Sequence, residues 1–379
     1  MQKKRIFVTI ILAILVILPF VIRKFKVLPT EPFGVEKFIT LALPKAAERS
    51  YYLKPCFSPD GQTFLIVDGT AIQKTFFSAP FPPRSESDYT QLLELDALLS
   101  TQAVAVSNQN PKTKIAFFAV ECLTGIPQLP PENVTPEFID AQPWRQRLYC
   151  YTPSTNEIQM LLDTEYLVEK DKNKKQLGHF EKISLVWSQD SETLFFCDGK
   201  STAIQRINLT DAKVDTFYSM EKDTRIVSPL FIRSDGRLSF VRMNGRLFDG
   251  ITLSASGEVH EKRLLYSLED EVNKHFKEFN QIITDTGVFA TIGERRFAYA
   301  LLDSNGTHIR IGSLDAPQQT QAHFFRDTDE NCYFFTPYAF TDNEDTLVLS
   351  RKFLRSRSKN PTPLSDDFSL TELGVIPSK

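Results

Sequence analysis

A tight turn that leads into a buried strand, between residues 55 and 67, constrains this chain more than any other feature. The turn begins at Ser58. Pro59 presets φ for the second turn position, Asp60 can bond its own backbone, and Gly61 supplies the positive φ of the exit at little steric cost. The residues that follow are mostly β-branched or aromatic and too few for a helix. The stretch therefore predicts one hairpin of an antiparallel sheet.

Five weaker copies of this turn follow along the chain. The equivalent positions are Ser58, Ser107, Ser188, Arg233, Thr284 and Thr341. The spacings between them are 49, 81, 45, 51 and 57 residues. Four of the five fit one supersecondary unit of about 40 to 50 residues, the period of propeller blades. Inserted sequence from Glu121 to Pro143, rich in proline, explains the longest spacing.

A second hairpin is predicted after four of these turns. Its strands are Arg147–Tyr151 with Glu157–Leu162, Ala203–Leu209 with Val214–Tyr218, Leu247–Leu253 with Val259–Leu265, and Phe297–Leu302 with His308–Ile311. Two hairpins per repeat make a four-stranded antiparallel blade, so six repeats predict an all-β, six-bladed β-propeller. The last repeat lacks a strand. The unpaired strand Lys37–Leu43 can supply it and close the ring by pairing the two chain ends.

These turns resemble the TolB-like, WD40-like propeller repeat. The resemblance rests on Phe57–Gly61, with Trp187–Asp190 and Ser234–Gly236 behind it, and covers about Leu53 to Ser350. It implies a binding platform with no catalytic residue to carry over.

The N-terminus predicts one transmembrane helix. Lys3, Lys4 and Arg5 precede an apolar run from Ile6 to Ile22, which is about the minimum length that spans a bilayer as a helix. No small-residue cleavage site follows the run, which favours an uncleaved anchor over a signal peptide. We expect a signal anchor in residues 1–27, a tether in 28–36 and a single propeller domain in 37–379, on the periplasmic or other extracytoplasmic side of the membrane.

Composition and motifs exclude several functions. The net charge is −3 and the pI about 6.0, so the charge of the chain does not indicate a nucleic-acid partner. No Gly-x-Ser-x-Gly elbow occurs, which excludes an oligopeptidase. A lactonase-like hydrolase would hold a metal on the ring axis, and the residues near strand starts that could serve as ligands are Asp68, Asn244, Asp249 and Glu294. We interpret them as polar residues of turns and rims, and expect no cofactor, metal or catalytic residue.

Two insertions are the candidates for binding, because long loops on a rigid scaffold often form binding surfaces. Residues 81–99 contain Leu92 and Leu95, which belong either to a short helix capped by Ser87 or to the outer strand of the first blade. Residues 121–144 contain Phe138 and Trp144. We predict a non-catalytic module that binds a protein partner in a membrane or envelope complex, on one face of the ring. A metal-dependent hydrolase and a small-ligand or glycan sensor are the alternatives.

Overall fold

The structure is a computed structural model. It describes residues 39–44, 54–59, 61, 63–69, 74–95, 103–108, 113–122, 144–165, 184–197, 203–267, 290–303, 306–326, 331–341, 343–356 and 372–378. The chain divides into two units, Met1–Glu36 and Lys37–Lys379, and all of these residues belong to the second. No helix among them is long and apolar enough to cross a membrane, and the predicted anchor and tether lie outside them.

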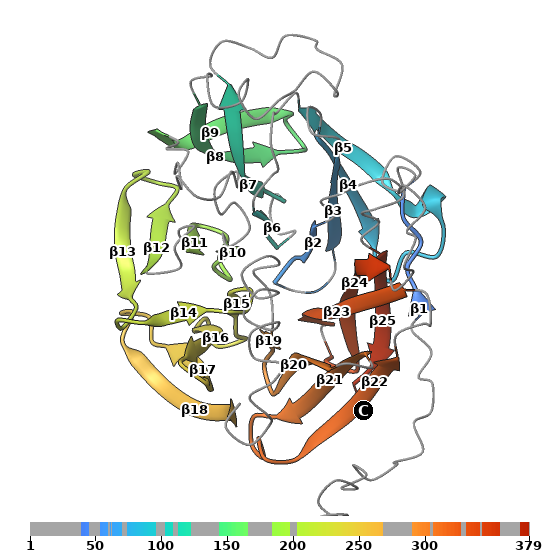
Figure 1. The fold of residues 1–379 in the computed structure, drawn as a ribbon. Helices are drawn as coiled ribbons and strands as arrows, with labels where there is room; N and C mark the ends of the chain where they lie inside the picture. Colours follow the sequence, from blue (N-terminus) through green and yellow to red (C-terminus); the bar gives the residue numbers. More distant parts are fainter. Residues whose placement is uncertain are drawn as a thin grey trace, which may run out of the picture. The chain divides into compact units, whose positions relative to one another are not determined.

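The second unit is built from six antiparallel sheets, the blades of a β-propeller (Figure 1). Blade 1 contains β2 (Lys54–Phe57), β3 (Thr63–Gly69), β4 (Lys74–Pro80) and β5 (Thr90–Leu95); blade 2 contains β6 (Val104–Val106), β7 (Ile115–Cys122), β8 (Trp144–Thr152) and β9 (Glu157–Glu165); blade 3 contains β10 (Leu185–Trp187), β11 (Thr193–Cys197), β12 (Ala203–Asn208) and β13 (Val214–Ser219). Blade 4 contains β14 (Thr224–Ile226), β15 (Phe231–Ile232), β16 (Leu238–Asn244), β17 (Leu247–Leu253) and β18 (Val259–Ser267); blade 5 contains β19 (Ala290–Ile292), β20 (Arg296–Asp303), β21 (Gly306–Ser313) and β22 (Thr320–Arg326); blade 6 contains β23 (Asn331–Phe340), β24 (Thr346–Ser356), β25 (Glu372–Pro377) and β1 (Ile39–Thr40). In blade 4 the innermost strand is interrupted, because β14 and β15 both pair with β16. The predicted all-β, six-bladed propeller is confirmed.

One backbone hydrogen bond closes the turn between the first two strands of every blade. Its donors and acceptors are Ser58 N to Thr63 O, Ser107 N to Lys114 O, Ser188 N to Thr193 O, Arg233 N to Arg237 O, Gly293 N to Arg296 O and Thr341 N to Thr346 O, at 2.8 to 3.0 Å. In blades 1 to 3 the first turn residue is serine, and its Oγ also accepts from the amide that begins the second strand, as Ser58 Oγ does from Thr63 N at 2.9 Å. This second bond explains why serine recurs at these positions.

The fifth repeat corrects the sequence prediction. The sequence places the turn at Thr284 and the second strand of the blade at Val288–Ile292, but Ala290–Ile292 is the first strand, β19, and the turn begins at Gly293. Thr284 itself lies outside the described residues. The prediction was wrong because turn-forming residues have the same composition in a connection between blades as in a turn within one. The hairpin at Phe297–Leu302 is confirmed, as strands two and three of the blade.

The ring is closed by the two ends of the propeller domain, as predicted. β1 is the outermost strand of blade 6 and pairs antiparallel with β25, with Ile39 opposite Val375. Leu41, just after β1, is buried and packs with Phe64 of blade 1. This short strand therefore completes blade 6 beside the C-terminal strand, and the residue that follows it packs on the first blade.

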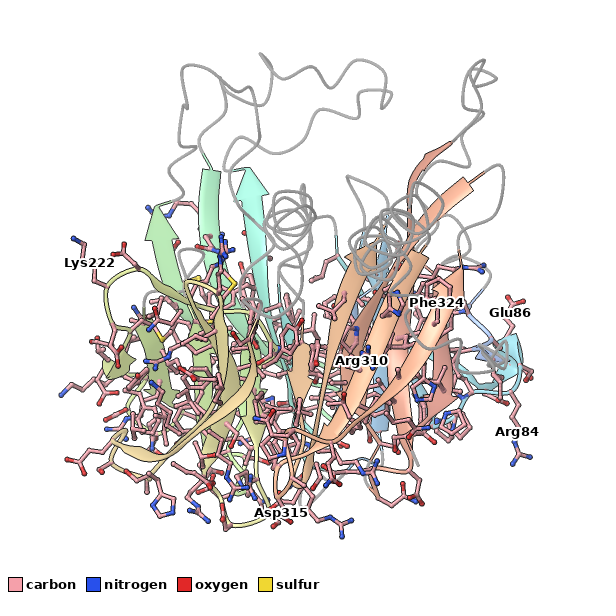
Figure 2. The ribbon with its side chains drawn as sticks, turned by 60° about the horizontal axis from the view of Figure 1, so that its bottom comes forward. Arg84, Glu86, Lys222, Arg310, Asp315 and Phe324 are labelled. Carbon is pink, nitrogen blue, oxygen red and sulfur yellow. The ribbon has the colours of Figure 1, made fainter. Side chains whose placement is uncertain are left out.

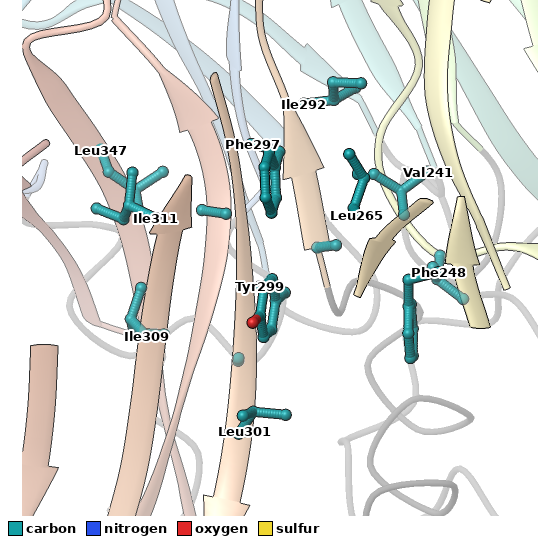
Figure 3. Close-up of a cluster of buried hydrophobic side chains, with 14 of the residues drawn as sticks. Val241, Phe248, Leu265, Ile292, Phe297, Tyr299, Leu301, Ile309, Ile311 and Leu347 are labelled. Atoms are coloured by element: carbon teal, nitrogen blue, oxygen red, sulfur yellow. The ribbon is translucent and has the colours of Figure 1, made fainter. Parts of the chain in front are cut away.

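The core lies between the blades, where apolar side chains of neighbouring sheets pack face to face. The largest cluster joins blades 4, 5 and 6 (Figure 3). At its centre Phe297 is 1% exposed, and a Cβ on Gly312 of the next strand would collide with its ring. Burial of such a side chain stabilises the fold by about 1.5–3 kcal/mol. These interfaces hold the blades at fixed positions around the ring.

The connections define two faces of the ring. We call the face with the connections from first to second and from third to fourth strand the turn face. We call the face with the connections from second to third strand and from blade to blade the linker face. Figure 2 shows Asp315 at the turn face and Lys222 at the linker face.

Candidate functional site

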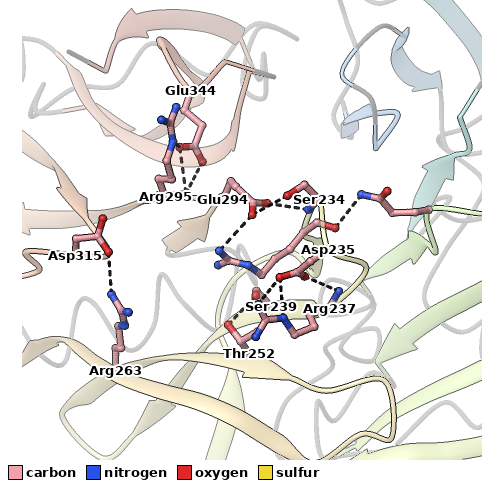
Figure 4. A network of polar contacts seen from close by, with 12 residues as sticks. Ser234, Asp235, Arg237, Ser239, Thr252, Arg263, Glu294, Arg295, Asp315 and Glu344 are labelled. Atoms are coloured by element: carbon pink, nitrogen blue, oxygen red, sulfur yellow. Dashed lines mark hydrogen bonds and ion pairs between the residues drawn. The ribbon is translucent and has the colours of Figure 1, made fainter.

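On the turn face, polar groups bond from blade to blade at four successive junctions. The contacts are Lys114 Nζ to Ser191 O (3.2 Å), Gln189 Nε2 to Arg233 O (2.8 Å), Ser234 N to Glu294 Oε2 (2.9 Å) and Arg295 N to Glu344 Oε1 (3.1 Å). Figure 4 shows the part that Ser234, Glu294, Arg295 and Glu344 form. We call this set of contacts the turn-face chain. It uses the polar groups of this face to connect blades 2 to 6.

Glu344 is the most buried acid of the turn-face chain. It is 4% exposed and has a positive φ of 56°, and both its carboxylate oxygens accept from Arg295 N at 3.1 Å. Gly293 leaves the space for this carboxylate, because a Cβ there would collide with Glu344 Oε1. Glycine is therefore required at this position for close approach rather than for its backbone freedom.

The linker face differs from the turn face in the length of the connections that attach to it. The four long connections 123–143, 166–183, 268–289 and 357–371 all join strand ends at this face. On the turn face the longest connection between strands is Phe81–Tyr89. Because binding residues occur disproportionately on long connections held by a rigid scaffold, the linker face is the candidate for recognition.

The first part of the first insertion and the second insertion lie at opposite faces of the ring. Phe81–Tyr89 joins β4 to β5 at the turn face, whereas the segment between Cys122 and Trp144 joins β7 to β8 at the linker face. The rings of Phe57 and Phe81 are 4.9 Å apart, and Tyr89 Oη donates to Ala42 O at 2.8 Å. The part of the first insertion before β5 therefore covers the ring closure, and it cannot form one surface with the second insertion on a single face, as the sequence had suggested.

Leu92 and Leu95 lie on β5, so the second of the two predicted alternatives, the outer strand of the first blade, is correct. A short 3-10 turn, Glu86–Asp88, precedes this strand. Both leucines are half-buried and pack against the cluster between blades 1 and 2. Tyr151 Oη of blade 2 also donates to Leu92 O at 3.0 Å. The leucines thus help to hold blade 1 on blade 2, and their contribution to partner binding stays a prediction.

A charged cluster lies on blade 2 at the root of the second insertion. Arg147 Nη1 donates to Glu121 Oε2 at 2.5 Å, and Tyr149 Oη donates to Glu121 Oε1 at 2.7 Å. Arg145 Nε and Arg147 Nε both approach Asp163 Oδ1, at 2.8 and 3.3 Å. We call these five residues the blade 2 cluster. They bind three strands together where β7 ends and β8 begins.

The cluster shifts the pKa values of its members. Burial would lower the pKa of Arg147, but its bonds with Tyr149, Glu121 and Asp163 outweigh burial and raise it. Burial and the bond to Glu121 raise the pKa of Tyr149 to about 12. Arg145 and Arg147 lower the pKa of Asp163. Arg147, Tyr149 and Asp163 therefore keep their usual charge at neutral pH.

The remaining predicted binding residues are near this cluster in the sequence. Trp144 begins β8 opposite Cys122, and its side chain is outside the described part of the chain. Phe138 is also outside it. Their roles stay predictions.

The residues considered as channel ligands are not brought together. They are Asp68, Asn244, Asp249 and Glu294, and the side chain of Asp68 is outside the described part. Asn244 and Asp249 lie at the linker-face end of blade 4, whereas Glu294 lies on the turn face and accepts from Ser234. Within the described residues, no group of three His, Cys, Asp or Glu side chains is placed to hold a metal ion.

Asp249 instead belongs to a buried ion pair that the sequence analysis missed. Its Oδ2 atom is 3.1 Å from Arg242 Nη2, and both side chains are at most 4% exposed. Glu221 Oε1 also lies 2.9 Å from Arg242 Nη1. Burial would lower the pKa of Arg242, but its bonds with Glu221 and Asp249 outweigh that effect and raise it.

Sequence periodicity predicts which side of a strand some of these charged residues occupy, but not which residues pair. Arg145 and Arg147 alternate with period two, which places them on one face of a strand. Glu121 and Asp163 lie on neighbouring strands, and their pairing depends on a register that the sequence does not reveal. Arg242 and Asp249 flank a short turn whose sequence is typical of a hairpin. Nothing in the local sequence shows that the two side chains are buried.

The fold is that of a six-bladed β-propeller whose long connections attach to one face. No family model matches the chain, and no curated protein sequence matches it.

The structure is similar to several solved propellers. With TolB from Acinetobacter baumannii the TM-score is 0.42 at 13% identity over 86% of this chain, and the match spans only 63% of the TolB chain. With an oligogalacturonate lyase from Vibrio parahaemolyticus it is 0.44 at 11% identity, over 90% of this chain and 91% of the lyase. With a chain of a nidogen/laminin complex it is 0.42 at 10% identity, over 84% of this chain and 99% of that one.

Proposed function

We propose that this protein is a membrane-anchored β-propeller that binds a protein partner and performs no catalysis. The partner binds the linker face at blade 2, through residues 121–144, and belongs to a membrane or envelope complex. Residues 6–22 anchor the protein, and the propeller domain lies on the extracytoplasmic side of the membrane.

The observation that carries the proposal is the difference between the connections of the two faces. The long connections attach to the linker face, whereas polar groups of the turn face are used in bonds between blades. The blade 2 cluster supports the choice of blade 2, because it fixes the strands from which residues 123–143 leave and return. A rigid root lowers the entropy that a recognition loop loses on binding.

A crosslinked purification of the full-length protein from detergent-solubilised membranes tests the partner. Residues 123–143 are replaced by a short Gly-Ser turn, and the control replaces residues 166–183, which also attach to the linker face. We expect one stoichiometric protein partner with the unmodified chain and the control, and its loss in the first variant. Absence of any partner from the unmodified chain would overturn the proposal.

Extraction of membranes with alkaline carbonate tests the anchor. The full chain should stay in the pellet, and a variant with two aspartates placed within residues 6–22 should be released, because each charge at the centre of a helix costs about 2.5–3.5 kcal/mol on insertion. A C-terminal alkaline phosphatase fusion should be active if the propeller is exported. An inactive but stable fusion would contradict the proposed orientation.

A further inference from the structure

The outer strand of blade 2 exposes large apolar side chains at its free edge. Among the strands that the structure describes, β9 is the last in its sheet, after β6, β7 and β8. Ile158 is 43% exposed and Met160 50% exposed, and all four residues from Glu157 to Met160 are exposed. Such a row of exposed residues on an outermost strand offers unpaired backbone groups together with apolar contact area.

Ile158 and Met160 point to the same side of the sheet. Ile158 is opposite Tyr151 and Met160 opposite Tyr149, and both tyrosines pack in the cluster between blades 1 and 2. Tyr151 also bonds the backbone of Leu92, so the outer strand of blade 1 lies beside this side of β9. The exposed pair therefore continues the apolar surface that starts between the two blades.

The outer strand of blade 4 also exposes apolar side chains, but its edge carries basic residues. β18 exposes Val259 and Leu264, but Lys262 and Arg263 lie between them. Charged side chains, lysine above all, are the usual protection of a sheet edge against another strand. The segment Glu157–Met160 contains no lysine, arginine or proline, and the bulge that disturbs β9 comes only after Met160.

The charges at this edge are acidic. The ionisable side chains of β9 are all acids, and Asp163 is already balanced by Arg145 and Arg147. Among the described residues no ion pair involves Glu157, which adjoins the exposed apolar pair. A basic residue in an added strand would meet Glu157.

We propose that the edge of β9 at Glu157–Met160 binds an extended segment of a partner protein as a fifth strand of blade 2. The segment has apolar residues at alternate positions, which cover Ile158 and Met160, and a basic residue opposite Glu157. Backbone hydrogen bonds supply affinity in this mode of recognition, and alternate side chains supply specificity. A second copy of β9 fits less well, because its ionisable side chains are all acids and none of them can pair with Glu157.

A peptide titration tests the edge directly. The probe is a fluorescein-labelled peptide of alternating valine and threonine with a lysine at each end, and its anisotropy is measured with the full-length protein in detergent micelles. The double variant Ile158→Lys with Met160→Lys should weaken binding about tenfold or more. The matched control, Val259→Lys with Leu264→Lys on β18, should change it less than about twofold. Equal effects of the two double variants would overturn the proposal.

Charge reversal provides a second test. Glu157→Lys should weaken binding of the lysine-flanked peptide and strengthen binding of the same peptide flanked by glutamates. Weakening of both peptides alike, or of neither, would contradict the assigned role of Glu157. If the protein sediments as a dimer that the Ile158→Lys and Met160→Lys changes make monomeric, the edge binds a second copy and the proposed occupant is wrong.

This inference rests on the proposed function for the identity of the occupant, and the two can fail separately. If the unmodified chain purifies with a partner that the Ile158→Lys and Met160→Lys variant also retains, the inference about β9 fails while the proposed function stands. If no partner purifies but the peptide binds with the expected dependence on these residues, the proposed function fails while β9 remains a strand-binding edge.

Discussion

The turn face and the linker face of this propeller use the same strands in different ways. On the turn face the inner turns bond to one another across four blade junctions, and the largest insertion there covers the ring closure. On the linker face the strand ends are fixed by side-chain pairs within blades, such as the blade 2 cluster and the Arg242–Asp249 pair, and the long connections begin and end there. The difference indicates that bonds between blades on the turn face maintain the ring, while the long connections of the linker face can vary without breaking those bonds.

The largest expected effect is at the linker-face end of blade 4. Asp249→Ala leaves Arg242 buried with only the exposed Glu221 as a charged partner, so the free energy of unfolding should fall by about 3–5 kcal/mol. Urea denaturation of the full-length protein in micelles measures it. The paired change Arg242→Met with Asp249→Leu should recover most of the loss, and a loss below about 1 kcal/mol for Asp249→Ala would show that the pair does not hold this face.

The turn-face chain should respond more weakly. Glu344→Ala removes the acceptor of the Arg295 amide in a buried position, and we expect a loss of about 2 kcal/mol in the same denaturation experiment. The control is Glu192→Ala, which removes a pair with Lys114 whose acid is 54% exposed and should cost less than about 0.5 kcal/mol. Equal losses would mean that burial does not distinguish the junctions of this face.

Glycine should be the more stable residue at the same position of two turns of this face. Ser191 has a φ of 60° and a buried Oγ without a hydrogen-bond partner among the described residues, so Ser191→Gly should stabilise the protein by about 1 kcal/mol. Gly61 occupies the equivalent position in blade 1 with a φ of 68°, and Gly61→Ala should destabilise it by about the same amount. Thermal unfolding measures both variants, and a shift of the same sign for both would contradict the role of backbone strain.

The smallest expected effect is a dependence of stability on pH that arises from a histidine within a blade rather than from the turn face. Burial lowers the pKa of His323, in β22, below its usual 6.5. The unfolded chain therefore takes up a proton near pH 6.5 while the folded chain does not, so stability should fall as the pH falls through this value. His323→Gln should remove this dependence.

Two aspartates of the turn face should make stability depend on pH under more acidic conditions. Bonds from Ser188 and from the Glu192 amide lower the pKa of Asp190, and Arg237 lowers that of Asp235. Their contributions are present above the usual aspartate pKa of about 3.9 and are lost as the pH falls below it. A stability curve that is flat from pH 7 to 5 in the unmodified protein would contradict the assignment to His323.

The sequence by itself determined the repeat and the ring. The turn chemistry of Ser58 to Gly61 is local, since each residue meets a backbone requirement of its own turn, and the copies of this pattern revealed the blades. Counting strands per repeat also predicted that residues near Ile39 close the ring with the C-terminal strand. The predicted position of the turn was wrong in the fifth repeat, where turn-forming residues occur in the connection between blades, before β19.

Only the tertiary structure decided which residues meet. The opposite faces of the second insertion and the first part of the first insertion follow from strand direction, and the pairing of Glu121 with Arg147 follows from register between strands. The exposed edge at Ile158 and Met160 depends on the order of strands in the blade. These are long-range properties, because a shift of register by one residue reverses every side chain of a strand while leaving its local sequence pattern unchanged.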